Sequence, residues 1–185
     1  MNTSIVTTTR QYVYKECKKK INIFGMNAYN HHFKSVVMYA KELAIRSGAD
    51  LEIVLLAAWL HDIASIKGEY EDHHIKGQIY AEEFLQKQNY PQDRINQIKH
   101  CIHAHRGSKA IERQTIEASC VCDADAMSHF NTISSLFYLA INVRKLDATK
   151  ANEFVKQKLQ RSYSKLTPLG KEIINEKYLA AMKVL

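Results

Sequence analysis

The stretch LEIVLLAAWLHDIA, residues 51–64, is the most informative segment of this sequence. Apolar side chains would cover every side of a helix formed by its first ten residues, which predicts a buried helix rather than a surface one. An adjacent ionisable pair, His61 and Asp62, follows this apolar run. Burying such a pair is unfavourable unless something compensates for the lost hydration, and a bound metal ion is the usual compensation. The segment therefore predicts a buried helix that carries metal ligands near its end.

Helical periodicity extends over nearly the whole chain. Apolar residues recur at spacings of three and four, and no internal repeat is visible. Gly48 is expected to end one helix and Asp50 to cap the next. The sequence thus predicts an all-α fold in which the whole chain, 1–185, forms one helical domain. The expected helices cover about residues 10–24, 31–47, 51–64, 73–88, 92–105, 116–138, 147–163 and 171–184.

The composition also fits a single globular domain. The chain has 185 residues, of which 46% are hydrophobic, with only 2 prolines and 6 glycines, which disfavours long disordered segments and a turn-rich all-β fold. No apolar run reaches the roughly 18–20 residues of a membrane span. Because the N-terminal segment lacks the apolar centre of a secretory signal, a cytoplasmic protein is expected. The four cysteines lack CxxC spacing and are expected to be reduced thiols.

The net charge of +7 indicates the kind of partner. Excess positive charge attracts phosphate-bearing molecules, from nucleotides to nucleic acids. Aromatic and basic residues do not alternate as they do in base-stacking modules, which argues against nucleic acid as the partner. A small phosphate-bearing molecule, such as a nucleotide, is therefore expected.

Further histidines and aspartates that could bind a metal lie on both sides of the His61–Asp62 pair. None of the histidine clusters has the HxxxH spacing that places two ligands on one helical face, so each is expected to supply one ligand from its own helix. Imidazole and carboxylate ligands suit divalent manganese, iron, cobalt, nickel or zinc, and two His with two Asp leave positions for water and substrate. The candidates are His32, His73 or His74, His103 or His105, and Asp123 or Asp125.

Read in order, His32, His61-Asp62 and Asp125 resemble the H…HD…D signature of the HD-domain superfamily of metal-dependent phosphohydrolases. The resemblance runs from about residue 30 to about residue 140. It implies a helical bundle of the HD-domain type with a metal-binding core at about 28–142 and a C-terminal helical extension at about 147–185. It also implies that these four residues bind the first divalent metal ion, for which magnesium is a further candidate.

Some members of the superfamily have an extended H…HD…H…H…D pattern. The segments DHHIKG, at 72–77, and IHAHRG, at 102–107, resemble its two additional positions. His73 and His105 fit these positions better than His74 and His103, and Asp125 fits the end of the signature better than Asp123. A second metal ion, bridged to the first through Asp62, is compatible with this pattern.

The resemblance implies hydrolysis of a phosphate ester or phosphoanhydride, of a nucleotide or a similar compound. A divalent ion lowers the pKa of a bound water and polarises the phosphoryl oxygen. Asp62 could orient or deprotonate that water. Arg106, Lys109 and Lys67 are candidates to neutralise phosphate charge because they closely follow candidate ligands.

Two other functions remain open at this level. Some HD-fold proteins hold a di-iron centre and oxygenate their substrates, and the six-ligand pattern permits that chemistry. A non-catalytic domain that senses a nucleotide is the other alternative, although a complete ligand set argues against it. The C-terminal helices could either pack on the core or form a contact between two copies of a homodimer.

Overall fold

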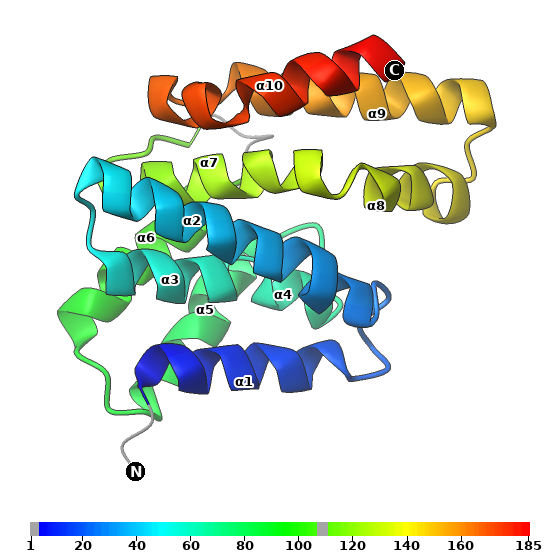
Figure 1. Cartoon of the computed structure of the whole chain (residues 1–185). Helices are drawn as coiled ribbons and strands as arrows, with labels where there is room; N and C mark the ends of the chain where they lie inside the picture. Colours follow the sequence, from blue (N-terminus) through cyan, green and yellow to red (C-terminus); the bar gives the residue numbers. More distant parts are fainter. Residues whose placement is uncertain (1–3, 107–110) are drawn as a thin grey trace.

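The computed structural model describes residues 4–106 and 111–185. Within these ranges every regular element is helical and there is no strand, so the predicted all-α fold is confirmed (Figure 1). The α-helices are α1 (Ile5–Cys17), α2 (Lys34–Ser47), α3 (Leu51–Leu60), α4 (Ile63–Ile66), α5 (His73–Gln86), α6 (Gln92–Ala104), α7 (Ile116–Asn131), α8 (Ile133–Tyr138), α9 (Ala148–Ser164) and α10 (Pro168–Val184). Two short π-helical segments, η1 (Ala28–Phe33) and η2 (Leu139–Val143), complete the set.

Helix α3 lies in the middle of the bundle, as its sequence, apolar except for Glu52, predicts. It contacts α1, α2, α6 and α7, and these helices surround it. Ile53, Leu56 and Leu60 are fully buried. The ring of Trp59 stacks against that of Tyr29, with the centroids 5.6 Å apart. The burial of this helix places its C-terminal end, and the residues that follow, deep inside the protein.

The caps on either side of the α2–α3 turn follow the sequence closely. Gly48 ends α2 in the left-handed conformation, with φ of 74°. The carboxylate of Asp50 accepts hydrogen bonds from the backbone N–H groups of Glu52 and Ile53 at 3.0 and 3.1 Å. Arg94 of α6 also donates to Asp50, at 3.0 Å. The turn therefore holds the start of α3 against α6.

The helix predicted over 51–64 is interrupted at the His61–Asp62 pair. Helix α3 ends at Leu60, and the short helix α4 begins at Ile63. The backbone of Asp62 leaves the helical conformation, with φ of −111° and ψ of 21°. Adjacent residues of a regular helix point about 100° apart. The break allows the neighbouring side chains of His61 and Asp62 to face the same space.

The C-terminal helices α9 and α10 lie alongside α7 and cover one side of the bundle (Figure 1). The buried carboxylate of Asp123, on α7, fixes this contact. It accepts a hydrogen bond from Arg113 at 2.8 Å, and from the backbone N–H and the hydroxyl of Thr167 at 3.0 and 2.5 Å. Thr167 in turn caps α10, which begins with Pro168 and so starts earlier than predicted. The C-terminal extension thus packs on the core.

None of the described helices is both long and apolar enough to span a membrane. All four cysteines are buried free thiols, as the sequence predicts.

Candidate metal centre

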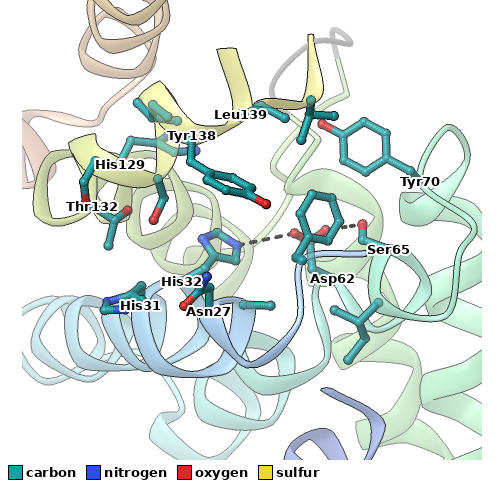
Figure 2. A pocket seen from close by; sticks show the side chains of 17 residues that line it. Asn27, His31, His32, Asp62, Ser65, Tyr70, His129, Thr132, Tyr138 and Leu139 are labelled. Atoms are coloured by element: carbon teal, nitrogen blue, oxygen red, sulfur yellow. Dashed lines mark hydrogen bonds and ion pairs between the residues drawn. The ribbon is translucent and has the colours of Figure 1, made fainter. Parts of the chain in front are cut away.

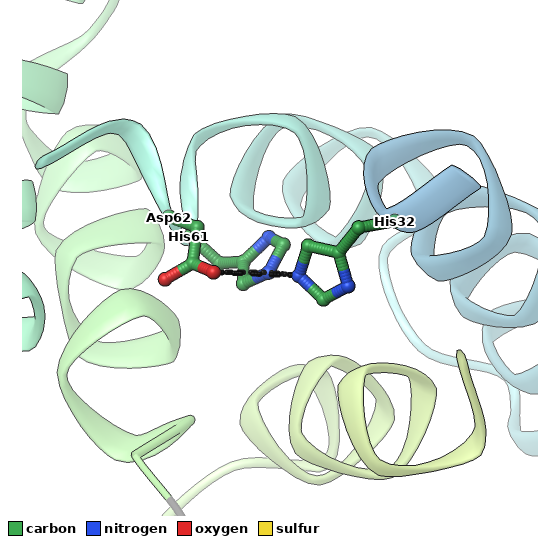
Figure 3. Close-up of side chains that lie close together, drawn as sticks. All are labelled: His32, His61 and Asp62. Carbon is green, nitrogen blue, oxygen red and sulfur yellow. Dashed lines mark hydrogen bonds and ion pairs between the residues drawn. The ribbon is translucent and has the colours of Figure 1, made fainter. Parts of the chain in front are cut away.

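The side chain of Asp62 lies between two pairs of histidines. One carboxylate oxygen, Oδ2, lies 3.3 Å from Nε2 of His32 and 3.7 Å from Nε2 of His61. The other oxygen, Oδ1, lies 3.5 Å from Nε2 of His73 and 3.7 Å from Nε2 of His105. Figure 3 shows the first group, in which His32 faces the His61–Asp62 pair from a different helix. Two groups of ligand atoms therefore share one carboxylate.

In each of the four histidines the other ring nitrogen, Nδ1, faces a hydrogen-bond acceptor. The Nδ1 atoms of His61, His73 and His105 lie 2.8, 2.7 and 2.5 Å from the backbone carbonyls of Ala58, Tyr70 and Ile102. Nδ1 of His32 lies 3.3 Å from the hydroxyl of Ser128, whose own proton is donated to the carbonyl of Asp125. These acceptors assign the ring proton to Nδ1. Each Nε2 then offers a lone pair toward Asp62, which is the usual arrangement of metal-binding histidines.

The electrostatics of the centre distinguish His61 from His32 and His105. Burial lowers the pKa of His61 to about 4, so its imidazole is neutral at pH 7. Nε2 of His61 lies only 2.9 Å from Nε2 of His32. Although burial alone would raise the pKa of Asp62, the adjacent His61 and the hydrogen bonds of His105 and His32 hold it well below its usual value. Burial alone would lower the pKa values of His32 and His105, but hydrogen bonding to Asp62 raises them. A divalent metal ion would replace the protons on these Nε2 atoms and leave neutral imidazoles around an ionised carboxylate.

Of the two aspartates on α7, only Asp125 faces this centre. Its Oδ1 lies 3.6 Å from Nε2 of His32 and 3.9 Å from Nε2 of His61. Asp123 lies two residues earlier and points toward Arg113 and Thr167 instead. The two carboxylates therefore contact different parts of the protein, and only Asp125 can complete a ligand set with His32.

The structure separates the paired histidines in the same way. His73 and His105 join the group around Asp62. His74 is buried beside them, with Nδ1 3.0 Å from Arg106 and its ring stacked on that of His103. Within the two described ranges, neither His74 nor His103 belongs to a group of candidate ligand atoms.

The three cations predicted to neutralise phosphate differ in their placement. Arg106 lines a cavity that opens from the metal centre, where it also contacts His74 and the carbonyl of Glu71. Lys67 lies outside that cavity, with Nζ 3.3 Å from Glu16. Its ammonium also lies over the ring of Tyr80, so this placement does not support the predicted contact with phosphate. Lys109 falls outside the described residues.

Two cavities meet at the candidate metal centre and share His32, Asp62 and His129 among their lining residues. The first, of about 340 Å³, is shown in Figure 2 and is lined largely by apolar and aromatic side chains, including Phe24, Tyr138 and Leu139. The second, of about 690 Å³, is more polar. Its cationic side chains are Arg106, Arg113, Arg144, Lys158, Arg161 and Lys165. Both volumes fall in the range of small-molecule sites.

Sequence reasoning missed His129 and most of these cations. His129 lies four residues after Asp125 on α7, a spacing that places both side chains on one helical face. Its Nδ1 lies 3.0 Å from the hydroxyl of Ser162 on α9. The spacing from Asp125 is the signal that could have identified His129. Of the missed cations, Arg144, Lys158, Arg161 and Lys165 come from segments after the signature, and the sequence alone does not show that these segments reach the cavity.

Comparison with known proteins agrees with this geometry. The family model of the HD domain matches residues 29–129, more than half of the chain. The protein therefore belongs to the HD domain family. The matched segment contains His32, the His61–Asp62 pair and Asp125.

Solved structures share the fold over nearly the whole chain. An HD-superfamily hydrolase from Bacillus thuringiensis is 20% identical with a TM-score of 0.73, over 97% of this chain and 92% of that one. The Lin1889 protein from Listeria innocua is 19% identical with a TM-score of 0.71, over 97% and 91%. A protein from Lactobacillus plantarum is 20% identical with a TM-score of 0.70, over 100% and 95%. The similarity includes the C-terminal helices. No curated protein matches the sequence significantly.

Proposed function

We propose that this protein is a metal-dependent phosphohydrolase that cleaves a phosphate ester or phosphoanhydride, with a nucleotide as its substrate. The observation that carries the proposal is the position of Asp62. Its two oxygens face two pairs of histidine Nε2 atoms, at the junction of an apolar and a cationic cavity. Divalent metal ions held by His32, His61, Asp62 and Asp125, and by His73 and His105, would supply Lewis acidity and lower the pKa of a bound water.

The protein's own residues suit the steps of hydrolysis. The oxygen of water forms a bond to phosphorus and keeps one of its protons, the bond from phosphorus to the leaving-group oxygen breaks, and the second proton of the water passes to that oxygen. Because Asp62 has a pKa well below its usual value, it stays ionised and is better suited to orient the water than to take its proton. Arg106 lines the same space and can neutralise the phosphoryl oxygens.

The lining also supports a nucleotide as substrate. The apolar cavity is large enough for an organic group and contains the aromatic rings of Phe24 and Tyr138. The cationic cavity suits the phosphates. The same cationic lining supports an anionic, phosphate-bearing substrate.

The test combines metal analysis with phosphate release. Purified protein, loaded with each candidate divalent metal, would be assayed against nucleoside mono-, di- and triphosphates. Asp62→Ala should lose bound metal and activity together. Asp72→Ala should retain both, because Asp72 is exposed and its carboxylate makes no capping hydrogen bond at the start of α5. Metal-dependent hydrolysis that is undiminished in Asp62→Ala would overturn the proposal. Iron-dependent oxygen consumption without phosphate release would support the oxygenase, and tight nucleotide binding without turnover a sensor.

A further inference from the structure

The cationic cavity receives much of its charge from the C-terminal extension rather than from the part of the chain that carries the HD signature. Lys158 and Arg161 lie on α9, and Lys165 is the residue that ends it. They follow one another at intervals of three and four residues, so they share one face of the helix. Over seven residues this face extends about 10 Å along the cavity wall. A row of this length can contact several anionic groups in succession.

This row of cations has few internal partners. In the part of the chain that the structure describes, no salt bridge involves Lys158, Arg161 or Lys165. Burial, followed by the charge of Lys158, lowers the pKa of Lys165, as expected for crowded like charges. Clustered cations that lack carboxylate partners and line a cavity are favourable for binding an anion of several charges.

Two arginines from outside α9, Arg113 and Arg144, also line the cationic cavity. The guanidinium of Arg144, which follows η2, lies over the ring of Phe154, 4.6 Å from its centroid. Phe154 also lines the cavity, and this contact fixes the direction of the arginine. Arg113 is held by the buried Asp123 at 2.8 Å. Arginines fixed in this way present planar donors to phosphate oxygens with little loss of conformational entropy.

The relation between the two cavities defines where a substrate would react. Both cavities include Asp62 and His129 in their lining, so a molecule that fills both passes the metal centre. The organic group fits the apolar cavity, and the charged end fits the wall formed by α9. The phosphorus that reacts would then lie at the junction, with further phosphates extending along α9.

We infer that Lys158, Arg161 and Lys165 of the C-terminal extension, together with Arg113 and Arg144, form a binding site for a chain of two or more phosphates. This inference rests on the proposed function and refines it, because the site would select di- and triphosphates over monophosphates. The C-terminal extension is then a specificity element, and its packing on α7 serves to bring these cations to the metal centre.

The test compares substrates that differ only in the length of the phosphate chain. Lys158→Gln, Arg161→Gln and Lys165→Gln would be assayed against the mono-, di- and triphosphate of one nucleoside. Lys156→Gln is the matched control, since Lys156 lies on α9 but does not line the cavity. Each cavity variant should lower kcat/KM for the triphosphate about tenfold, the lower end of what a charge-assisted hydrogen bond contributes. The value for the monophosphate should change less than about twofold, and the control should match the wild type.

Calorimetric titration with inorganic triphosphate and orthophosphate provides a second readout that does not require turnover. Triphosphate should bind more tightly than orthophosphate, and the cavity variants should reduce this preference. Equal loss of activity on mono- and triphosphates, or no loss with either, would overturn the inference while leaving the phosphohydrolase intact. Binding that depends on the α9 cations, without hydrolysis of any substrate, would refute the proposed function and leave the phosphate site standing.

Discussion

Asp123 and Asp125 lie two residues apart on one helix, and the structure predicts opposite effects for their removal. Asp123 is 1% exposed and accepts three hydrogen bonds that hold α10 against α7. Asp125 instead faces the imidazoles of His32 and His61. Asp123→Ala should therefore lower the stability of the fold, whereas Asp125→Ala should lower metal binding.

The size of the effect follows from the contacts. Removing one partner of a buried ion pair costs about 3–5 kcal/mol. Because the side chain of Arg113 is 24% exposed and can be rehydrated, the lower end applies, and we expect a loss of about 3 kcal/mol for Asp123→Ala. For a chain of this length that corresponds to a fall in Tm of roughly 6–12 °C. Asp125 offers no such set of donors, so in chelator Asp125→Ala should change the free energy of unfolding by about 1 kcal/mol or less.

Two measurements separate these effects. Urea and thermal unfolding followed by far-UV circular dichroism, in chelator, gives the stability, and elemental analysis after dialysis against the divalent metal gives the stoichiometry. Asp72→Ala serves as the control for loss of an exposed carboxylate. A stable Asp123→Ala variant that has lost its metal, together with an Asp125→Ala variant that retains it, would show that the roles of the two aspartates are reversed.

The remaining predictions concern packing, the second group of ligands and pH. Gly170→Ala should lower Tm by several degrees, because an added Cβ would lie 2.5 Å from the carboxylate of Asp123; an unchanged Tm would contradict the close approach. His73→Ala should reduce bound metal from about two ions per chain to one in elemental analysis, and the control His31→Ala should keep both. A stoichiometry of two in His73→Ala would argue against metal binding by the group of Asp62, His73 and His105. In chelator, stability should fall as pH drops from about 6.5 to 4, because burial lowers the pKa of His61 to about 4 and the unfolded chain takes up that proton first. Burial lowers the pKa of His129 in the same direction, to about 3, so the loss should approach ~2.8 kcal/mol per pH unit in urea unfolding, ~1.4 for each histidine. A stability that is constant or rises over this range would contradict it.

The sequence by itself determined the helical class, the burial of α3 and several helix ends. These features depend on local periodicity and on caps such as Gly48 and Asp50, whose interactions extend over only a few residues. The order of His32, His61-Asp62 and Asp125 was also enough to indicate the family. Local signals did not predict the break between α3 and α4. The apolar run continues past His61 into Ile63 and Ala64, so the sequence pattern does not show that the helix ends at Leu60.

Only the tertiary structure decided which side chains meet. The choice of His73 over His74 for the group around Asp62 depends on the rotation of α5 about its axis, which its packing against α6 determines. The side of α9 that faces the cavity depends in the same way on its packing against α7, where Ser162 contacts His129. Helices converge on a shared centre through packing over long sequence separations, and a one-dimensional pattern does not specify those contacts.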